Sequence, residues 1–258
     1  MMKRWTRSAL LALMLAAAAC SPREQMLVLL STNDMHARIQ YFPQLAAAVA
    51  ACRDTVPGAV LVAAASPVAE ERQWGSENLP GAAIYASLGE LLKHDGLDAV
   101  WLVTPTSLHV EQIEESLLAG KHVFCEKPID HDVNKIKEVL DVVKETGKKY
   151  QVGFNRRFDH NFKAIRDAVV AGKVGKQQII KITSRDPEPP SIDYVKISGG
   201  IFLDMTIHDF DMVRYLSGAE VEEVYAEGSV TVDPEIGKAG DIDSGSVILT
   251  TKSGKIAQ

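Results

Sequence analysis

The chain has 258 residues, of which 46% are hydrophobic and 24% are charged, and its net charge at pH 7 is −6. There is enough apolar material for a core, which excludes a wholly disordered chain. The acidic balance argues against binding to a nucleic-acid phosphate backbone. Three cysteines, Cys20, Cys52 and Cys125, are too few for a disulfide framework.

The first twenty residues have the features of a secretory signal. Lys3, Arg4 and Arg7 precede an apolar run, residues 9–19, that is too short to span a bilayer. Small residues then lead to Cys20, as at the cleavage site of a bacterial lipoprotein. We therefore predict a signal peptide with a lipid anchor at Cys20, and an apolar N-terminal helix is the alternative.

Apolar runs and helical patterns alternate from residue 26 to residue 154. Continuous apolar runs are typical of strands in a parallel sheet, buried on both faces. The predicted strands are residues 26–31, 59–65, 98–104, 121–125 and 150–154. The predicted helices are residues 43–52, 85–92, 107–120 (capped by Ser107) and 132–146 (ended by Gly147), while prolines and glycines predict a loop over residues 66–81. This order predicts an α/β domain with a parallel sheet over residues 21–150.

The pattern changes after residue 150. The predicted elements are a helix at 160–171, a strand at 178–184, a proline-rich loop at 187–190, a helix near 201–217, and strands at 221–232 and 244–251. Longer strands with alternating polarity favour antiparallel pairing. We expect a second, α+β domain over residues 151–258 with a mainly antiparallel sheet.

One segment of the second domain combines acids with a histidine. On a helix, Asp204 and His208 are four residues apart and Asp211 follows three residues later, so all three project from one face. A carboxylate beside an imidazole fixes the tautomer of the ring and raises its basicity, as a general base requires. The alternative is a carboxylate in the first turn of a helix and a solvated surface histidine.

Two segments of the first domain lie at predicted strand ends. Lys127 follows residues 121–125 directly, at the edge where open α/β sheets bind ligands, and it can polarise a substrate oxygen there. Residues 104–109 end another strand and open a helix, which suits contacts to a ribose or a pyrophosphate. The alternatives are a solvated lysine and an ordinary capped turn.

Together these segments resemble the Gfo/Idh/MocA family of NAD(P)-dependent sugar and polyol dehydrogenases, over about residues 82–258. The matching stretches begin at Thr104 (Thr-Pro-Thr-Ser-Leu-His), Gly120 (Gly-Lys-His-Val-Phe-Cys-Glu-Lys-Pro), Val152 (Val-Gly-Phe-Asn-Arg-Arg-Phe-Asp) and Gly199 (Gly-Gly-Ile-Phe-Leu-Asp-Met-Thr-Ile-His-Asp-Phe-Asp). The last two, with residues 184–187, look most like inositol 2-dehydrogenases. The resemblance implies a Rossmann-like domain followed by a substrate domain.

The resemblance also implies the chemistry and its residues. Hydride passes from a polyol hydroxyl carbon, as in myo-inositol, to NAD or NADP; His208 takes the hydroxyl proton, Asp204 orients His208, and Lys127 stabilises the developing alkoxide. The implied polyol-binding residues are Arg156, Asp186 and Asp211. The implied cofactor contacts are Thr104, Pro105, Ser107, His109, Glu126 and Lys127. A cis Lys127–Pro128 bond and homo-oligomers formed through the open sheet face are implied as well.

The sequence departs from the family pattern in three places. The Gly-x-Gly-x-x-Gly turn that lets a pyrophosphate approach the backbone is absent, since no Gly-x-Gly occurs. The acidic residue expected at the end of the second strand is also absent, because residues 62–66 read Val-Ala-Ala-Ala-Ser. The sequence therefore leaves the choice between NAD and NADP as the cofactor open. Family members continue beyond the strands found here, so the second domain is expected to be truncated.

Residues 27–39 resemble the start of secreted 5'-nucleotidase-type metallophosphoesterases, with Asp34 and His36 as weak metal-ligand candidates. Further ligands are missing downstream, so we predict no working metal site. The chain is interpreted as a hybrid joined within residues 66–81, which requires strand 26–31 to lie beside strand 98–104. The alternatives to a dehydrogenase are a phosphoesterase remnant and an inactive sugar-binding protein, and the compartment stays open between cytoplasm and cell envelope.

Overall fold

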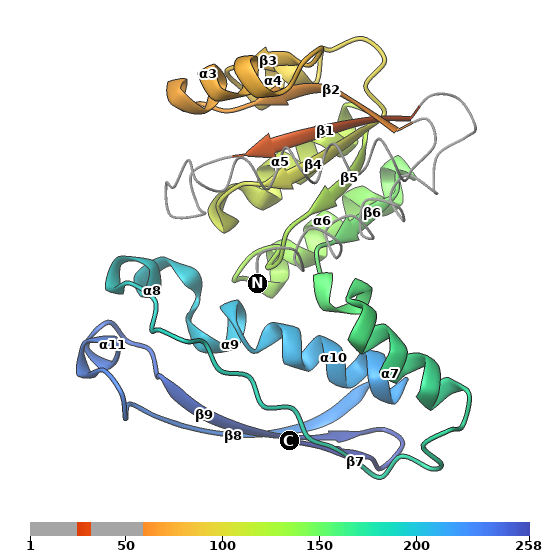
Figure 1. The fold of residues 1–258 in the computed structure, drawn as a ribbon, viewed down its shortest axis with the longest axis vertical. Helices are drawn as coiled ribbons and strands as arrows, with labels where there is room; N and C mark the ends of the chain where they lie inside the picture. Colours follow the sequence, from red (N-terminus) through yellow and green to blue (C-terminus); the bar gives the residue numbers. More distant parts are fainter. Residues whose placement is uncertain (1–24, 32–58) are drawn as a thin grey trace. The chain divides into compact units, whose positions relative to one another are not determined.

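In the computed structural model, residues 25–31 and 59–258 are described, with side chains from residue 61 onward. The chain divides into two compact units, the first ending at Asn155 and the second comprising Arg156–Gln258. Figure 1 shows the first unit in red to green and the second in green to blue. Each unit has its own sheet and is described separately.

The sheet of the first unit has six parallel strands. They are β1 (Gln25–Ser31), β2 (Ala59–Ala65), β3 (Ala83–Tyr85), β4 (Ala99–Val103), β5 (His122–Cys125) and β6 (Tyr150–Val152). Their order is β3-β2-β1-β4-β5-β6, so the direction of winding reverses between β1 and β4. This is the order of a Rossmann fold, in which ligands bind at the carboxyl edge near the reversal. The predicted parallel sheet is confirmed, including strand 26–31 beside strand 98–104.

The described helices of this unit are α3 (Ala69–Asn78), α4 (Leu88–Leu91), α5 (Thr106–Leu118) and α6 (Val133–Thr146). Apolar side chains of α5 and α6, among them Ile113 and Val139, are fully buried with Leu102 of β4. Helix α6 ends at Gly147 in a left-handed conformation, as predicted. The predicted N-cap of α5 is wrong, because Pro105 is the N-cap residue and Ser107 lies inside the helix.

The loop predicted over residues 66–81 is also wrong, because most of it forms α3. Pro67 precedes the helix, where a missing N–H costs nothing. Gly75 lies inside it, where a Cβ would approach Cδ1 of Ile84 in β3 to 3.0 Å. The glycine therefore allows close packing of α3 on the sheet, instead of ending the helix.

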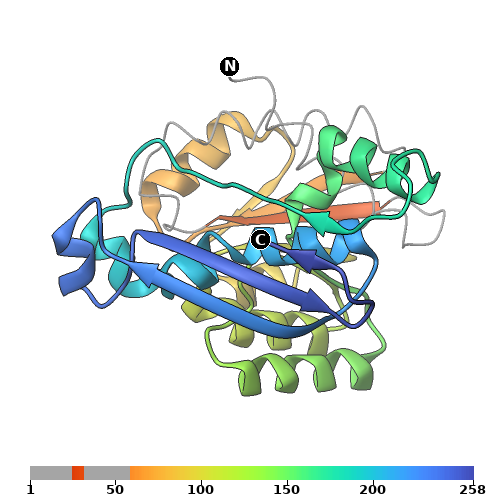
Figure 2. The ribbon, with the colours of Figure 1, turned by 90° about the horizontal axis from the view of Figure 1, so that it is seen from below.

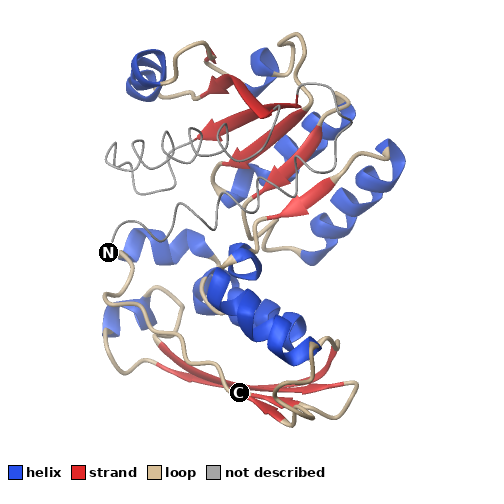
Figure 3. Ribbon diagram, turned by 45° about the vertical axis from the view of Figure 1, so that its right-hand side comes forward, coloured by secondary structure: helices blue, strands red, loops and turns tan. Residues whose placement is uncertain are grey.

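The second unit places helices against one face of a smaller sheet (Figures 2 and 3). Its helical elements are η2 (Asn155–Phe158, which begins in the first unit), α7 (His160–Val170), α8 (Ile192–Ser198), α9 (Gly200–Asp204), α10 (Ile207–Ser217) and α11 (Pro234–Lys238). Its strands are β7 (Ile179–Ile180), β8 (Val221–Ser229), β9 (Ser244–Thr251) and β10 (Ile256–Ala257), in the order β7-β10-β9-β8. Only the pair β7–β10 is parallel, so the predicted mainly antiparallel sheet is confirmed.

The core of the second unit lies between α10 and the sheet. Val213 and Leu216 of α10 are buried with Leu249 of β9 and Ala257 of β10. The predicted strand over residues 178–184 is mostly irregular, because only its first part pairs with the two-residue β10. Within the described residues, no helix combines the length and apolar character of a membrane span.

The single helix predicted near residues 201–217 is two helices, and this changes the geometry of the acid and histidine pair. Met205 and Thr206 separate α9 from α10, and the N–H of Thr206 bonds to the carbonyl of Ile201, five residues back, at 2.9 Å. Asp204 is therefore the last residue of one helix and His208 the second residue of the next. The pair does not lie on one uninterrupted helical face.

Candidate active site

The carboxyl end of β4 carries the first group of predicted cofactor residues. Thr104 is buried, and its hydroxyl donates to Oε1 of Gln112 in α5 at 2.6 Å. Pro105 is the N-cap residue of α5, and Ser107 lies in the first turn of that helix. This local bonding fixes the start of α5 at the edge where the topology predicts a ligand.

His109 connects two loops at this edge. Its ring is buried, with Nδ1 2.7 Å from the carbonyl oxygen of Pro128 and Nε2 2.7 Å from that of Thr104. The carbonyls belong to the segments that follow β5 and β4, so His109 holds these segments together. The structure gives His109 this bonding role, and a contact with the cofactor stays a prediction.

Glu126, Lys127 and Pro128 follow β5, and the Lys127–Pro128 peptide is cis, as the resemblance implies. The N–H of Glu126 donates to the carbonyl of Leu102 at 3.0 Å, which continues the sheet pairing by one residue. Burial raises the pKa of the Glu126 carboxyl to about 7, although the neighbouring charge of Lys127 opposes the shift. Near neutral pH this side chain therefore exists in both protonation states.

Gly153 makes room for the Glu126 carboxyl. A Cβ at this position would lie 2.6 Å from Oε2 of Glu126, which is closer than atoms pack. The N–H of Gly153 also donates to the carbonyl of Cys125 at 2.7 Å. The end of β6 thus forms a cradle for this carboxyl group, and the glycine is required because the backbone approaches it so closely.

This edge of the first unit fits a dinucleotide as far as it is described. The sheet order places the reversal between β1 and β4, and Thr104 and Glu126 lie at the carboxyl ends of β4 and β5. The turn that would follow β1 belongs to residues 32–58, which lie outside the described residues. Thr104, Ser107, Glu126 and Lys127 are the residues of this edge that could contact the cofactor.

In the second unit, α9 carries the predicted acid, Asp204, and α10 carries the predicted base, His208. The turn between α8 and α9 uses Gly199 and Gly200, both with positive φ. The carboxylate of Asp241 accepts the N–H of Ile201 at 3.1 and 3.2 Å and so holds the first turn of α9. Tyr194 of α8 donates its hydroxyl to Oδ1 of Asp204 at 2.9 Å, which fixes one carboxylate oxygen.

A second carboxylate lies directly after His208. Asp209 accepts an ion pair from Arg156 of η2 and a hydrogen bond from the hydroxyl of Ser184 at 2.7 Å. Three segments distant in sequence therefore meet at this carboxylate. Arg156, predicted to bind the polyol, is held in place by Asp209, whereas Asp186 is exposed.

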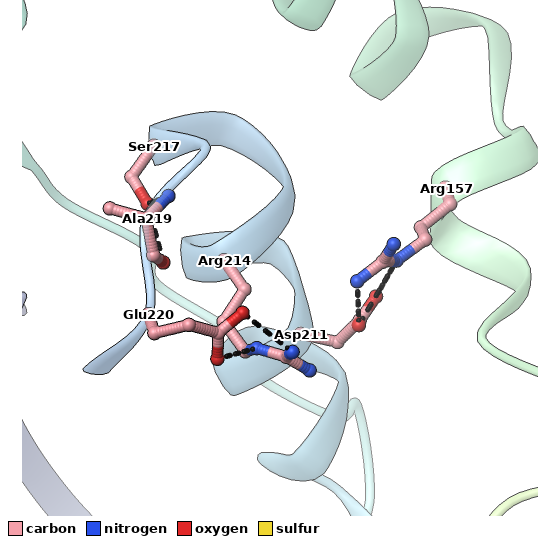
Figure 4. A network of polar contacts seen from close by, with 6 residues as sticks. All are labelled: Arg157, Asp211, Arg214, Ser217, Ala219 and Glu220. Atoms are coloured by element: carbon pink, nitrogen blue, oxygen red, sulfur yellow. Dashed lines mark hydrogen bonds and ion pairs between the residues drawn. The ribbon is translucent and has the colours of Figure 1, made fainter.

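Asp211, also predicted to bind the polyol, makes a two-point ion pair with Arg157. Nε of Arg157 lies 2.7 Å from Oδ2 and Nη2 lies 2.5 Å from Oδ1 (Figure 4). The side chain of Asp211 is only 3% exposed, and Arg157 also stacks on the ring of Tyr215. Figure 4 shows a second such pair, Arg214 with Glu220, at the end of α10.

The sequence did not indicate Tyr194, Ser184 or Asp209 as members of this group. Asp209 had one usable signal, since it lies beside His208 in the matching stretch. Ser184 likewise lies in residues 184–187, which contribute to the resemblance, whereas Tyr194 had no signal because it reaches Asp204 from a different helix. Lys127 belongs to the first unit, whereas Asp204 and His208 belong to the second.

Within the described residues there is no group of three or more His, Cys, Asp or Glu side chains that could hold a metal ion. Asp34, His36 and Cys20 lie outside the described residues. The structure therefore adds nothing to the resemblance of residues 27–39 to a phosphoesterase.

Both units match known families. Residues 43–154 match the family described as "Oxidoreductase family, NAD-binding Rossmann fold" and residues 162–258 match the "GFO/IDH/MocA C-terminal domain". The first match begins well before residue 82, where the motifs alone placed the start of the resemblance. It also runs through residues 66–81, the segment in which a junction was predicted.

Curated relatives and solved structures agree with this match. A myo-inositol 2-dehydrogenase of Thermotoga maritima is 48% identical over 194 residues, covering 75% of this chain and 58% of the relative. An inositol 2-dehydrogenase of Rhizobium meliloti is 54% identical over 161 residues, covering 62% of this chain and 49% of the relative. The chain thus spans between about half and three fifths of the length of these relatives.

Among solved structures, a probable dehydrogenase from Thermotoga maritima has a TM-score of 0.81 and 40% identity, covering 90% of this chain and 67% of that one. A scyllo-inositol dehydrogenase from Lactobacillus casei, solved with bound NAD(H) and scyllo-inositol, has a TM-score of 0.78 and 31% identity, covering 91% of this chain and 68% of that one. Since the two family matches fall one in each unit and together span most of the sequence, the protein belongs to the Gfo/Idh/MocA family of oxidoreductases.

Proposed function

We propose that the chain carries the catalytic residues of an NAD(P)-dependent dehydrogenase that oxidises a hydroxyl of an inositol-like polyol to a ketone. The observation that carries this proposal is the likeness to the scyllo-inositol dehydrogenase solved with NAD(H) and scyllo-inositol. It covers 91% of this chain, so it necessarily includes most of both units. The relatives named as inositol 2-dehydrogenases support the same substrate class.

In the proposed reaction the polyol loses a proton from its hydroxyl and a hydride from the same carbon. His208 accepts the proton at a ring nitrogen, and Asp204, itself held by Tyr194, orients and tunes that ring. Lys127 donates a hydrogen bond to the reacting oxygen as negative charge develops on it. When bound, the nicotinamide supplies the acceptor for the hydride.

Arg156 and Asp186 are proposed to recognise the other hydroxyls of the polyol. The bond from Asp209 supports this role for Arg156, because a held guanidinium loses less freedom on binding. Asp211 is saturated by Arg157, so we infer that it acts by positioning that arginine.

The test is cofactor reduction by the purified chain with NAD or NADP and with myo-inositol or scyllo-inositol. Lys127→Met and His208→Asn should each lower kcat by roughly 10²–10⁴-fold, the usual contribution of a positioned acid or base. Lys135→Met and His131→Asn, at exposed positions after β5, are the matched controls and should keep kcat. Absence of reduced cofactor with every substrate, or full activity of both site variants, would contradict the proposal.

We also infer that two copies associate through the outer face of the second sheet. Four exposed apolar side chains form a stripe across the strands, here called the outer stripe: Ile179, Tyr225, Ile248 and Ile256. The strand register supports a common face, since Tyr225 pairs with Ile248 and Ile256 pairs with Ile179. Homo-oligomers usually pair one patch with its symmetry-related copy, which a stripe of this kind suits.

The predicted leader, the lipid anchor at Cys20 and the phosphoesterase-like segment stay predictions. All three fall on residues outside those described. The catalytic residues named in the proposed reaction, Lys127, Asp204 and His208, all lie after residue 104.

A further inference from the structure

The first unit has an acidic side chain at the end of β2 that the sequence pattern did not reveal. In a Rossmann fold a carboxylate at this place binds the ribose hydroxyls of NAD, whereas a nearby arginine accommodates the extra phosphate of NADP. Residues 62–66 contain no acid. The structure supplies one from the first turn of α3, where Glu71 lies.

Glu71 is hydrogen-bonded to the residue that follows β2. The hydroxyl of Ser66, the residue that follows β2, donates to Oε2 of Glu71. Ser66 itself is only 5% exposed, and its hydroxyl accepts the N–H of Val68 at 3.1 Å. The donor is therefore fixed, and it fixes the carboxylate beside the end of the strand.

The two oxygens of this carboxylate have different surroundings. Ser66 engages Oε2, whereas Oε1 receives no hydrogen bond from the part of the chain that the structure describes. The side chain is partly exposed, so a ligand at the carboxyl edge can reach it. An acceptor of this kind suits a pair of neighbouring ribose hydroxyls.

Arg72, the residue after Glu71, also forms a hydrogen bond at the end of β2. Its Nη1 donates to the carbonyl oxygen of Ser66 at 2.8 Å. A carboxylate and a guanidinium therefore meet at the same strand end. The first repels a ribose 2′-phosphate and the second attracts it, so the balance between them sets the cofactor preference.

We propose that Glu71 replaces the missing strand-end acid, binds the adenosine ribose and selects NAD over NADP. This inference rests on the proposed function and adds the cofactor preference. The competing explanation is that Glu71 only stabilises the first turn of α3, as glutamates at this helix position often do. A purely structural role would change stability and leave the ratio of the two cofactor affinities unaltered.

The experiment is calorimetric titration of the purified full chain with NAD⁺ and, separately, with NADP⁺. Glu71→Gln should lower the preference for NAD⁺ by roughly 10–100-fold, the range for a lost charged hydrogen bond. Glu70→Gln is the matched control, because it removes the same charge from an exposed side chain in the same turn. Adding Arg72→Leu to Glu71→Gln should reverse any gain in NADP⁺ affinity. Thermal melting of each variant verifies that it is folded.

The outcomes separate the two proposals. If the wild type binds NAD⁺ and Glu71→Gln leaves the affinity ratio unchanged, the role of Glu71 is overturned and the dehydrogenase proposal stands. If the wild type prefers NADP⁺, the role of Glu71 is also overturned, and Arg72 is then the residue that sets the cofactor preference. If the wild type binds neither cofactor, both proposals are overturned.

Discussion

Glu126 shows how one buried carboxyl group makes stability depend on pH. Its pKa is raised from 4.5 to about 7, mainly by burial, so the folded protein favours the neutral form. As pH rises from 4.5 to 7, the unfolded chain loses this proton before the folded chain does. The contribution of Glu126 to the free energy of unfolding is therefore fully present below pH 4.5 and is lost as pH rises through 7.

Glu126→Gln should remove this dependence, because glutamine keeps the shape and does not ionise. Relative to the wild type, the variant should gain free energy of unfolding as pH rises from 4.5 to 7, by on the order of 3 kcal/mol at most. Urea denaturation across this pH range measures the difference. Glu111→Gln, at an exposed position on α5, should change nothing. Parallel curves for wild type and Glu126→Gln would show that the carboxyl is solvated.

Helix α9 offers a test of how a short element is held. It has five residues, too few for stability from its own hydrogen bonds, and Asp241 accepts the N–H of Ile201 in its first turn. Asp241→Ala should lower the free energy of unfolding by ~1 kcal/mol, the usual cost of losing a helix cap. It should also lower kcat in the proposed reaction, because Asp204 ends this helix.

The matched control for Asp241→Ala is Asp193→Ala in α8. The side chain of Asp193 is 97% exposed, and its ion pair with Lys196 lies at the surface, where such pairs contribute little. The measurement is urea denaturation of both variants together with their kcat values. Equal losses in the two variants would show that Asp241 does not hold α9.

The elements that the sequence predicted correctly are those with a long apolar pattern of their own. Strand β2 was predicted with its observed bounds, because Ala59–Ala65 is a continuous apolar run. Helix α6 was predicted because both its apolar stripe and its terminal Gly147 are local signals. Helix α3 was missed because Gly75 reads as a helix breaker unless the contact with Ile84 is known.

The break between α9 and α10 had no local signal either. Residues 201–217 carry no proline or internal glycine, so periodicity favours one helix. The structure begins α9 at two glycines and holds its first turn by Asp241, forty residues later in the chain. A contact that distant cannot be read from a helical pattern.

Within the described part of the chain, the sequence named candidate site residues but not the contacts that hold them. Lys127, Asp204 and His208 were named from stretches that match the family. The residues that hold this group were not named, since Tyr194 binds Asp204 from another helix. The same is true of Gly153, which follows β6 and makes room for the Glu126 carboxyl. Motifs indicate candidate groups for the chemistry, whereas the groups that hold them depend on which elements the fold brings together.

The proposed association of two copies depends on the outer stripe of the second sheet. Ile248 is 42% exposed near the middle of this stripe, and Tyr225, its partner across β8 and β9, is 61% exposed. Ile248→Lys places a charge there without emptying the core, so it should shift the protein towards monomer and leave the melting temperature of the monomer nearly unchanged. Val170→Lys on α7, which is 68% exposed and lies off the sheet, is the matched control and should leave the association state as it is. Light scattering after size-exclusion chromatography measures both. If Ile248→Lys keeps the mass of the wild type, or if the wild type is already monomeric, copies do not associate through this face.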